Sequence, residues 1–148
     1  MVELVGRGLT VSTIKRVSDA VDLEGSGTWK HRIAGAAEVM IASASRFALL
    51  HEMPPDTMEP DVGELLSRLA PVDIVLLDGF RRSNYPKMEV VPAGQDRALL
   101  APGDSMVLAI TSDLSVEADV PCFALSDIGV LAEFVLANAR GSRHLPVI

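Results

Sequence analysis

The run from Val72 to Leu77 constrains the fold of this chain more than any other stretch. Apart from Asp73 it is apolar and without alternation, which predicts a strand buried on both faces of a parallel sheet. Asp78 and Gly79 follow at once. Ligands of parallel α/β sheets collect beyond the carboxyl ends of the strands, so Asp78 is well placed to hold Mg²⁺ against a phosphate group. The alternative is that Asp78-Gly79 is only a turn.

Short apolar strands alternate with helical segments along the rest of the chain. Strands are predicted at 9–15, 37–43, 46–51, 87–91, 106–110 and 120–125. Helices are predicted to begin at caps formed by Thr28, Asp61 and Ser126, and residues 1–7 resemble the last turns of another helix. This order predicts an α/β fold with a mostly parallel sheet flanked by helices. We expect the pair at 37–51 to be antiparallel and to make the sheet mixed.

The composition argues against several classes of protein. A chain of 148 residues is long enough for one domain. Its formal net charge of −7 argues against binding to the phosphate backbone of nucleic acids. No apolar run approaches the length of a membrane helix. The single cysteine, Cys122, excludes an internal disulfide and fits a reducing, cytoplasmic compartment, and its apolar neighbours predict that it packs in the core.

A second strand also ends in polar residues, at Thr111-Ser112-Asp113. In a nucleotide site Asp113 could accept hydrogen bonds from N1–H and the 2-amino group of guanine; the alternative is a helix cap or a loop aspartate. Lys15 ends an earlier strand, and Asp22 lies in the loop behind it. A lysine and a carboxylate near one strand end could bind phosphate and metal, although solvated loop charges are the commoner explanation.

Five segments of the chain form a distinctive series: HRIAGAAEVMIAS (31–43), RFALLHEM (46–53), LLSRLAPVDIVLLDGFRRSNYPKMEV (65–90), LLAPGD (99–104) and VLAITSD (107–113). Together these segments resemble the MobB family of molybdopterin-guanine dinucleotide biosynthesis proteins. They match in order and spacing, the resemblance extends over about three quarters of the chain, and PKMEV after DGFRR is the most distinctive. The resemblance implies a P-loop NTPase-like protein that binds GTP with Mg²⁺, hydrolyses it weakly and forms homodimers. It also implies a role beside the guanylyltransferase that joins GMP to molybdopterin, and contact with other molybdopterin-handling proteins.

The resemblance also assigns roles to individual residues. Asp78, followed by Gly79, stands at the Walker B-like acid of the family. Lys15 matches the lysine of the family's K-H-x-H-H segment, and Asp22 matches the acid shortly after it. Thr111 and Asp113 stand at the strand tip that lies near guanine. The implied nucleotide site is therefore Lys15, Asp78, Gly79, Thr111 and Asp113, with Asp78 and Asp22 toward the metal, and no catalytic residue is assigned.

The chain departs from the family pattern in its first part. The phosphate loop G-x-x-x-x-G-K-[ST] has no match, and the glycine-rich stretch 25–28 lacks the lysine. Residues 1–7 align with the end of the helix that follows that loop, so the family's first strand and phosphate loop are missing from the 148 residues. Either the recorded start lies downstream of the true one, or this is a shortened paralogue. We expect the 148 residues alone to bind GTP poorly.

Two functions follow from these observations. The first is a GTP-binding accessory protein that assists the guanylyltransferase. The second is a non-enzymatic adaptor that contacts the proteins of cofactor synthesis and handles no nucleotide. The missing phosphate loop supports it, and so does the absence of the family's histidines after Lys15, where residues 16–19 are Arg, Val, Ser and Asp. A different P-loop kinase-like enzyme is disfavoured by the PKMEV and TSD segments.

Overall fold

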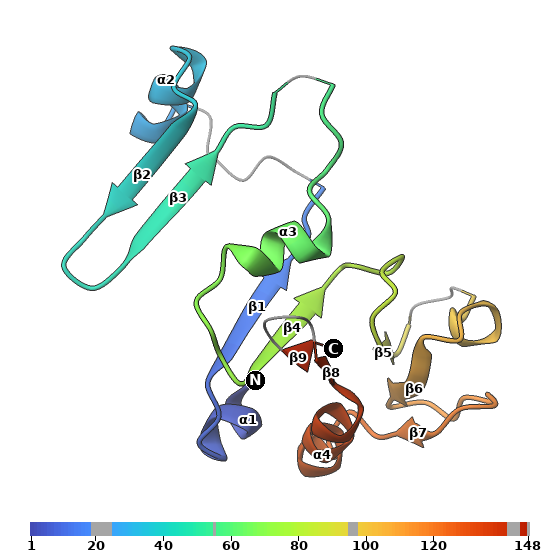
Figure 1. Cartoon of the computed structure of the whole chain (residues 1–148). Helices are drawn as coiled ribbons and strands as arrows, with labels where there is room; N and C mark the ends of the chain where they lie inside the picture. The colour runs from blue at the N-terminus through green and yellow to red at the C-terminus, as the bar shows by residue number, and fades with distance from the viewer. Residues whose placement is uncertain (19–24, 55, 95–97, 142–145, 148) are drawn as a thin grey trace. The chain divides into compact units, whose positions relative to one another are not determined.

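The computed structural model describes residues 1–18, 25–54, 56–94, 98–141 and 146–147 (Figure 1). The chain divides into two compact units. The larger unit consists of Met1–Arg16 and Asp61–Ile148, and the smaller unit is Val17–Pro60. Among the described residues, no helix has both the length and the apolar character needed to cross a membrane.

The first sheet of the larger unit is built around β4 (Ile74–Asp78). Its strand order is β1-β4-β9-β8, with β1 at Val11–Lys15, β8 at Arg140–Gly141 and β9 at Pro146–Val147. β1 pairs with β4 in parallel over five residues, from Val11 opposite Ile74 to Lys15 opposite Asp78. β9 is parallel to β4 and β8 is antiparallel to β9, so this sheet is mixed.

Helices cover both faces of the β1–β4 pair. On one face Leu66 of α3 (Val62–Ser67) packs against Val75. On the other face Ile74 packs against Leu4 of α1 (Val2–Gly6) and Ala132 of α4 (Ile128–Asn138). Because successive side chains of a strand point to opposite faces, neighbouring residues of β4 enter different clusters. The prediction of a strand buried on both faces is confirmed.

The second sheet of the larger unit is parallel throughout. Its order is β5-β6-β7, with β5 at Lys87–Val91, β6 at Val107–Ser112 and β7 at Cys122–Phe123. β6 lies in the middle of this sheet, where Ala109 and Ile110 are fully buried. A short 3₁₀ helix, η1 (Ala101–Gly103), lies between β5 and β6 in the sequence. The predicted α/β class with mostly parallel strands is confirmed.

The smaller unit contains α2 (Gly27–Ile33) and an antiparallel ribbon of β2 (Glu38–Ala42) and β3 (Phe47–His51). The antiparallel pairing is as predicted, but the ribbon forms a sheet of its own. The expectation that this pair makes the main sheet mixed is therefore wrong; β8 supplies the antiparallel strand instead.

Three further local predictions are corrected. Ser26, and not Thr28, caps α2, because the Ser26 hydroxyl accepts from the backbone N–H of Trp29. Ser126 does not cap α4: the N-cap is Asp127, whose side chain makes no cap hydrogen bond. Cys122 is exposed, since it lies on β7, a two-residue strand whose outer side has no neighbouring strand in the described part of the sheet.

Candidate functional site

The carboxyl ends of β1 and β4 bring two of the predicted site residues together. The strand register places Lys15 directly opposite Asp78, and Lys15 Nζ lies 3.0 Å from Asp78 Oδ2. Both side chains are well exposed, at 69% and 65%, so the ion pair stabilises the fold little. These two charges are instead accessible to a ligand at the strand ends.

Gly79 forms the turn that follows Asp78. Its φ is +86°, and a Cβ at this position would lie 3.0 Å from the backbone oxygen of Arg16. The chain at Arg16 is held there because its backbone N–H donates to the carbonyl of Asp78 at 2.8 Å. Glycine is therefore required both by the left-handed conformation and by the close approach of β1. The chain bends at Gly79 directly after β4, and the Asp78 carboxylate stays exposed beside Lys15.

A cavity of about 370 Å³ begins at this strand end. Apolar side chains form most of its wall, and Asp78, Arg81, Ser83, Tyr85, Lys87 and Glu89 add polar groups. Its remaining lining residues are Leu76, Leu77, Gly79, Phe80, Pro86, Met88, Val90, Leu100, Val107 and Val135. Its size and mixed lining are typical of a small-molecule site. The cavity meets β4 at its carboxyl end, at Asp78, and meets β5 and β6 at their amino ends, at Lys87 and Val107.

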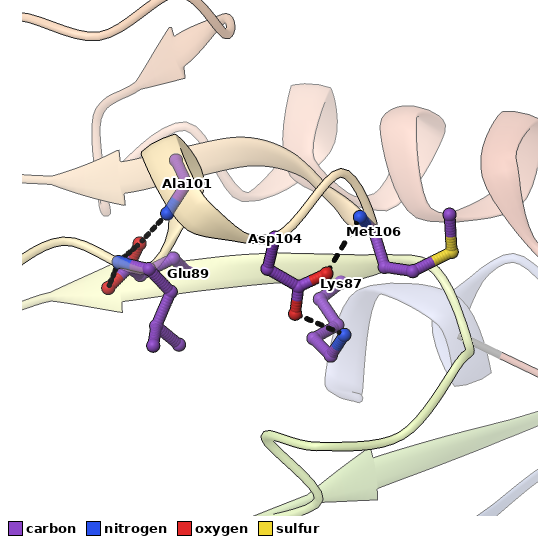
Figure 2. Close-up of polar contacts among 6 residues, drawn as sticks. Lys87, Glu89, Ala101, Asp104 and Met106 are labelled. Atoms are coloured by element: carbon purple, nitrogen blue, oxygen red, sulfur yellow. Dashed lines mark hydrogen bonds and ion pairs between the residues drawn. The ribbon is translucent and has the colours of Figure 1, made fainter.

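The β5 side of the cavity contains charged residues that the sequence did not single out. Figure 2 shows Lys87 and Glu89 beside the segment that follows β5 in the sequence. Lys87 Nζ lies 2.7 Å from Asp104 Oδ2, and Asp104 Oδ1 accepts from the Met106 N–H at 2.9 Å (Figure 2). These two bonds hold the pKa of Asp104 below its usual value, and the bond from Lys87 has the larger effect. The sequence signal that could have identified these residues is the charged pair Lys87 and Glu89, at alternate positions of the short strand KMEVV.

The other predicted site residues lie elsewhere. Thr111 is buried at the end of β6, and its hydroxyl has no hydrogen-bond partner among the described residues. Ser112 beside it donates to the carbonyl of Val91, and Asp113 is exposed just beyond the strand. Neither Thr111 nor Asp113 lines the cavity at β4. Asp22 lies outside the described residues, and within the described ranges no three His, Cys, Asp or Glu residues are grouped as a metal site.

The fold and this strand end together define a class. Parallel strands covered by helices, with an acid at the carboxyl end of a central strand, form an α/β protein of the P-loop NTPase-like kind. The family model for molybdopterin guanine dinucleotide synthesis protein B matches residues 1–113. The chain therefore belongs to the MobB family.

Curated relatives and solved structures agree with this assignment. The molybdopterin-guanine dinucleotide biosynthesis adapter protein of Escherichia coli (strain K12) is 32% identical over 90% of this chain and 78% of its own length. The protein of the same name from Haemophilus influenzae is 28% identical over 95% of this chain and 81% of its own length. A crystal structure of molybdopterin-guanine biosynthesis protein B superposes with a TM-score of 0.66 at 26% identity, covering 90% of this chain and 84% of that one. Bacillus subtilis MobB, at 20% identity, shares the fold with a TM-score of 0.65, covering 95% of this chain and 85% of that one.

Proposed function

We propose that this protein acts in molybdenum cofactor biosynthesis in the cytoplasm, as a GTP-binding accessory protein of the guanylyltransferase that attaches GMP to molybdopterin. The observation that carries this proposal is the family match over residues 1–113. Two relatives named as adapter proteins of molybdopterin-guanine dinucleotide biosynthesis, each aligned over at least 90% of the chain, support it.

The strand end at β4 supports a nucleotide site. Asp78 presents an exposed carboxylate next to the Lys15 ammonium, at the edge of the cavity. Mg²⁺ in nucleotide sites is commonly held by one or two carboxylates together with phosphate oxygens and water, so Asp78 would supply such a carboxylate. Lys15 would neutralise phosphate charge, and the Gly79 turn would let the backbone approach the ligand.

The end of β6 would contact the guanine base. Asp113 is exposed there and could accept from N1–H and the 2-amino group. The buried Thr111 hydroxyl lacks a partner among the described residues. A buried polar group without a hydrogen bond is costly, so a ligand atom bonded to this hydroxyl would relieve that cost.

Calorimetric titration of GTP with Mg²⁺ tests the nucleotide site, using protein purified from its native cells with each variant introduced into the chromosomal gene. Asp78→Ala should weaken GTP binding by about tenfold or more, because a carboxylate on the bound metal is lost. Asp127→Ala is the matched control, since this acid makes no side-chain cap bond. Equal affinity of Asp78→Ala and wild type would remove Asp78 from the site.

Capture experiments test the partner. The guanylyltransferase should be recovered with the protein from cell extract, and recovery should increase when GTP and Mg²⁺ are added. Recovery of the same amount with and without nucleotide, from protein that binds no GTP, would support the adaptor function in place of the nucleotide-dependent one.

The ribbon of β2 and β3 supports a homodimer. The strand register places Met40 opposite Leu49 and Ala42 opposite Phe47, so these four side chains share one face. Phe47 is 71% exposed, Met40 61% and Leu49 44%. Each strand has only the other as a partner within the described residues, so both outer edges are free for pairing. A second copy supplies the same apolar face and the same edges, which is what a two-fold interface requires.

A further inference from the structure

Glu89 is a buried carboxylate that accepts hydrogen bonds from a segment later in the sequence. It is 4% exposed, in the middle of β5. Its two oxygens lie 3.0 and 2.8 Å from the backbone nitrogen of Leu100, and Oε2 lies 3.2 Å from the nitrogen of Ala101 (Figure 2). Burying a carboxylate costs free energy, and hydrogen bonds from N–H donors offset that cost only while the donors stay in place. Glu89 therefore fixes the start of η1 against β5.

Lys87 fixes the other end of the same segment. Lys87 and Glu89 are two residues apart on β5, and both side chains reach the segment that follows β5 in the sequence. Lys87 Nζ donates to the Asp104 carboxylate, just after η1. The Lys87 backbone N–H donates to the backbone carbonyl of Met106 at 2.7 Å. Segment 100–106 is thus fastened at both ends to alternate residues of one strand (Figure 2). We call this pair of attachments the β5 clasp.

The β5 clasp also shapes the cavity at β4. Lys87, Glu89 and Leu100 all line it, together with Asp78 and Arg81. The backbone N–H of Leu100 donates to both carboxylate oxygens of Glu89, so this carboxylate determines where Leu100 lies in the cavity wall. Loss of the clasp would allow the segment to move and the cavity to change shape, without removing any group at the Asp78 end.

We propose that Glu89 is a positioning residue for nucleotide binding: it holds Leu100 in place as a wall of the cavity that begins at Asp78. This inference rests on the proposed function, because the ligand is GTP with Mg²⁺. Glu89 acts through Leu100 and η1, and the carboxylate itself faces backbone N–H groups. Neither the family resemblance nor the strand-end acids assign this role.

The test is a double-mutant cycle on GTP·Mg²⁺ affinity, measured by calorimetry with protein purified from native cells. Glu89→Gln should raise Kd by about tenfold, since one charge-assisted acceptor is replaced by an amide. Leu100→Ala should raise Kd to a similar degree, and the double variant should be no worse than either single one, because both changes remove the same wall. The amides of Leu100 and Ala101 should exchange faster with deuterium in Glu89→Gln, and Glu89→Asp should restore part of the affinity.

Glu64→Gln is the matched control. Glu64 also accepts from a backbone N–H at the start of a helix, that of Asp61 at 3.1 Å, but it does not line the cavity. The GTP·Mg²⁺ affinity of the Glu64→Gln variant should equal that of the wild type. Unchanged GTP affinity in both Glu89→Gln and Leu100→Ala, while the wild type binds, would overturn the positioning role alone. A wild type that binds no GTP·Mg²⁺ would instead overturn the proposed function, and the positioning role with it.

Discussion

Asp73 and Thr10 bond to each other reciprocally, next to the starts of β1 and β4. Asp73 Oδ2 accepts from both the backbone N–H and the hydroxyl of Thr10 at 2.7 Å, and the Asp73 N–H donates back to Thr10 Oγ1 at 2.9 Å. The hydroxyl bond of Thr10, then its backbone bond, lower the pKa of Asp73. The bonded carboxylate therefore favours the folded state only while it is ionised.

The reciprocal bonds between Asp73 and Thr10 predict that the stability of the folded protein falls at acidic pH. Because the pKa of Asp73 is lower in the folded state, its contribution is complete above the ordinary aspartate pKa of about 4 and is lost as pH falls through the lowered value. Asp73→Asn should lower Tm at pH 7, and the difference from wild type should shrink as pH falls below about 4. Calorimetric scans at several pH values measure this. Asp127→Asn is the control, and a pH-independent difference for Asp73→Asn would contradict the expectation.

Gly79 allows a second prediction at the same scale. Gly79→Ala places a Cβ at φ +86° and 3.0 Å from the Arg16 oxygen, so the free energy of unfolding should fall by about 2 kcal/mol or more. Gly94→Ala is a matched control, because Gly94 has φ +82° with nothing within 4 Å of the added Cβ. Urea titration of both variants separates the close contact from the conformation. Equal losses would show that β1 moves away without cost.

Helix α3 is the element whose start is best defined. The Asp61 side chain accepts from the Glu64 N–H at 2.8 Å, and the Glu64 side chain accepts from the Asp61 N–H, which together form a capping box. The helix matters to the sheet because its Leu66 packs on Val75 of β4. The cap therefore supports one face of the strand that carries Asp78.

Removing this cap predicts a measurable loss. Asp61→Ala should lower the free energy of unfolding by about 1 kcal/mol, because one donor at the helix start loses its acceptor. Asp127→Ala at the start of α4 should change it by less than about 0.5 kcal/mol, since Asp127 makes no side-chain cap bond. Chemical denaturation of the two variants provides the comparison, and similar losses at both positions would argue against the capping box as the cause.

At the scale of the whole molecule, the proposed dimer predicts that one substitution on the β2–β3 ribbon halves the mass of the assembly in solution. A charge on the shared apolar face of β2–β3 would have to be buried without a partner, so Phe47→Glu should convert the dimer to a monomer. Light scattering coupled to size-exclusion chromatography measures the mass. Met58→Glu is the control, because Met58 is 87% exposed and lies outside the ribbon. A wild-type mass equal to one chain would contradict the proposed dimer.

The sequence by itself determined the elements and the position of the acids. The lack of alternation from Ile74 to Leu77 predicted a strand buried on both faces, and the structure confirms this through two separate clusters. Asp61 was correctly predicted as a cap, and Asp78 and Lys15 were each correctly placed at a strand end. These features are local, because periodicity and capping depend on residues within a few positions of one another.

Only the tertiary structure decided which of these pieces meet. It placed Glu89 against residues 100 and 101, paired β2 and β3 only with each other among the described strands, and left Cys122 exposed although its neighbours are apolar. It also left Thr111 and Asp113 outside the cavity that begins at Asp78. The physical reason is that an apolar pattern specifies how deeply a strand is buried, whereas its partner strand and hydrogen-bond acceptors depend on long-range packing that no short stretch of sequence encodes.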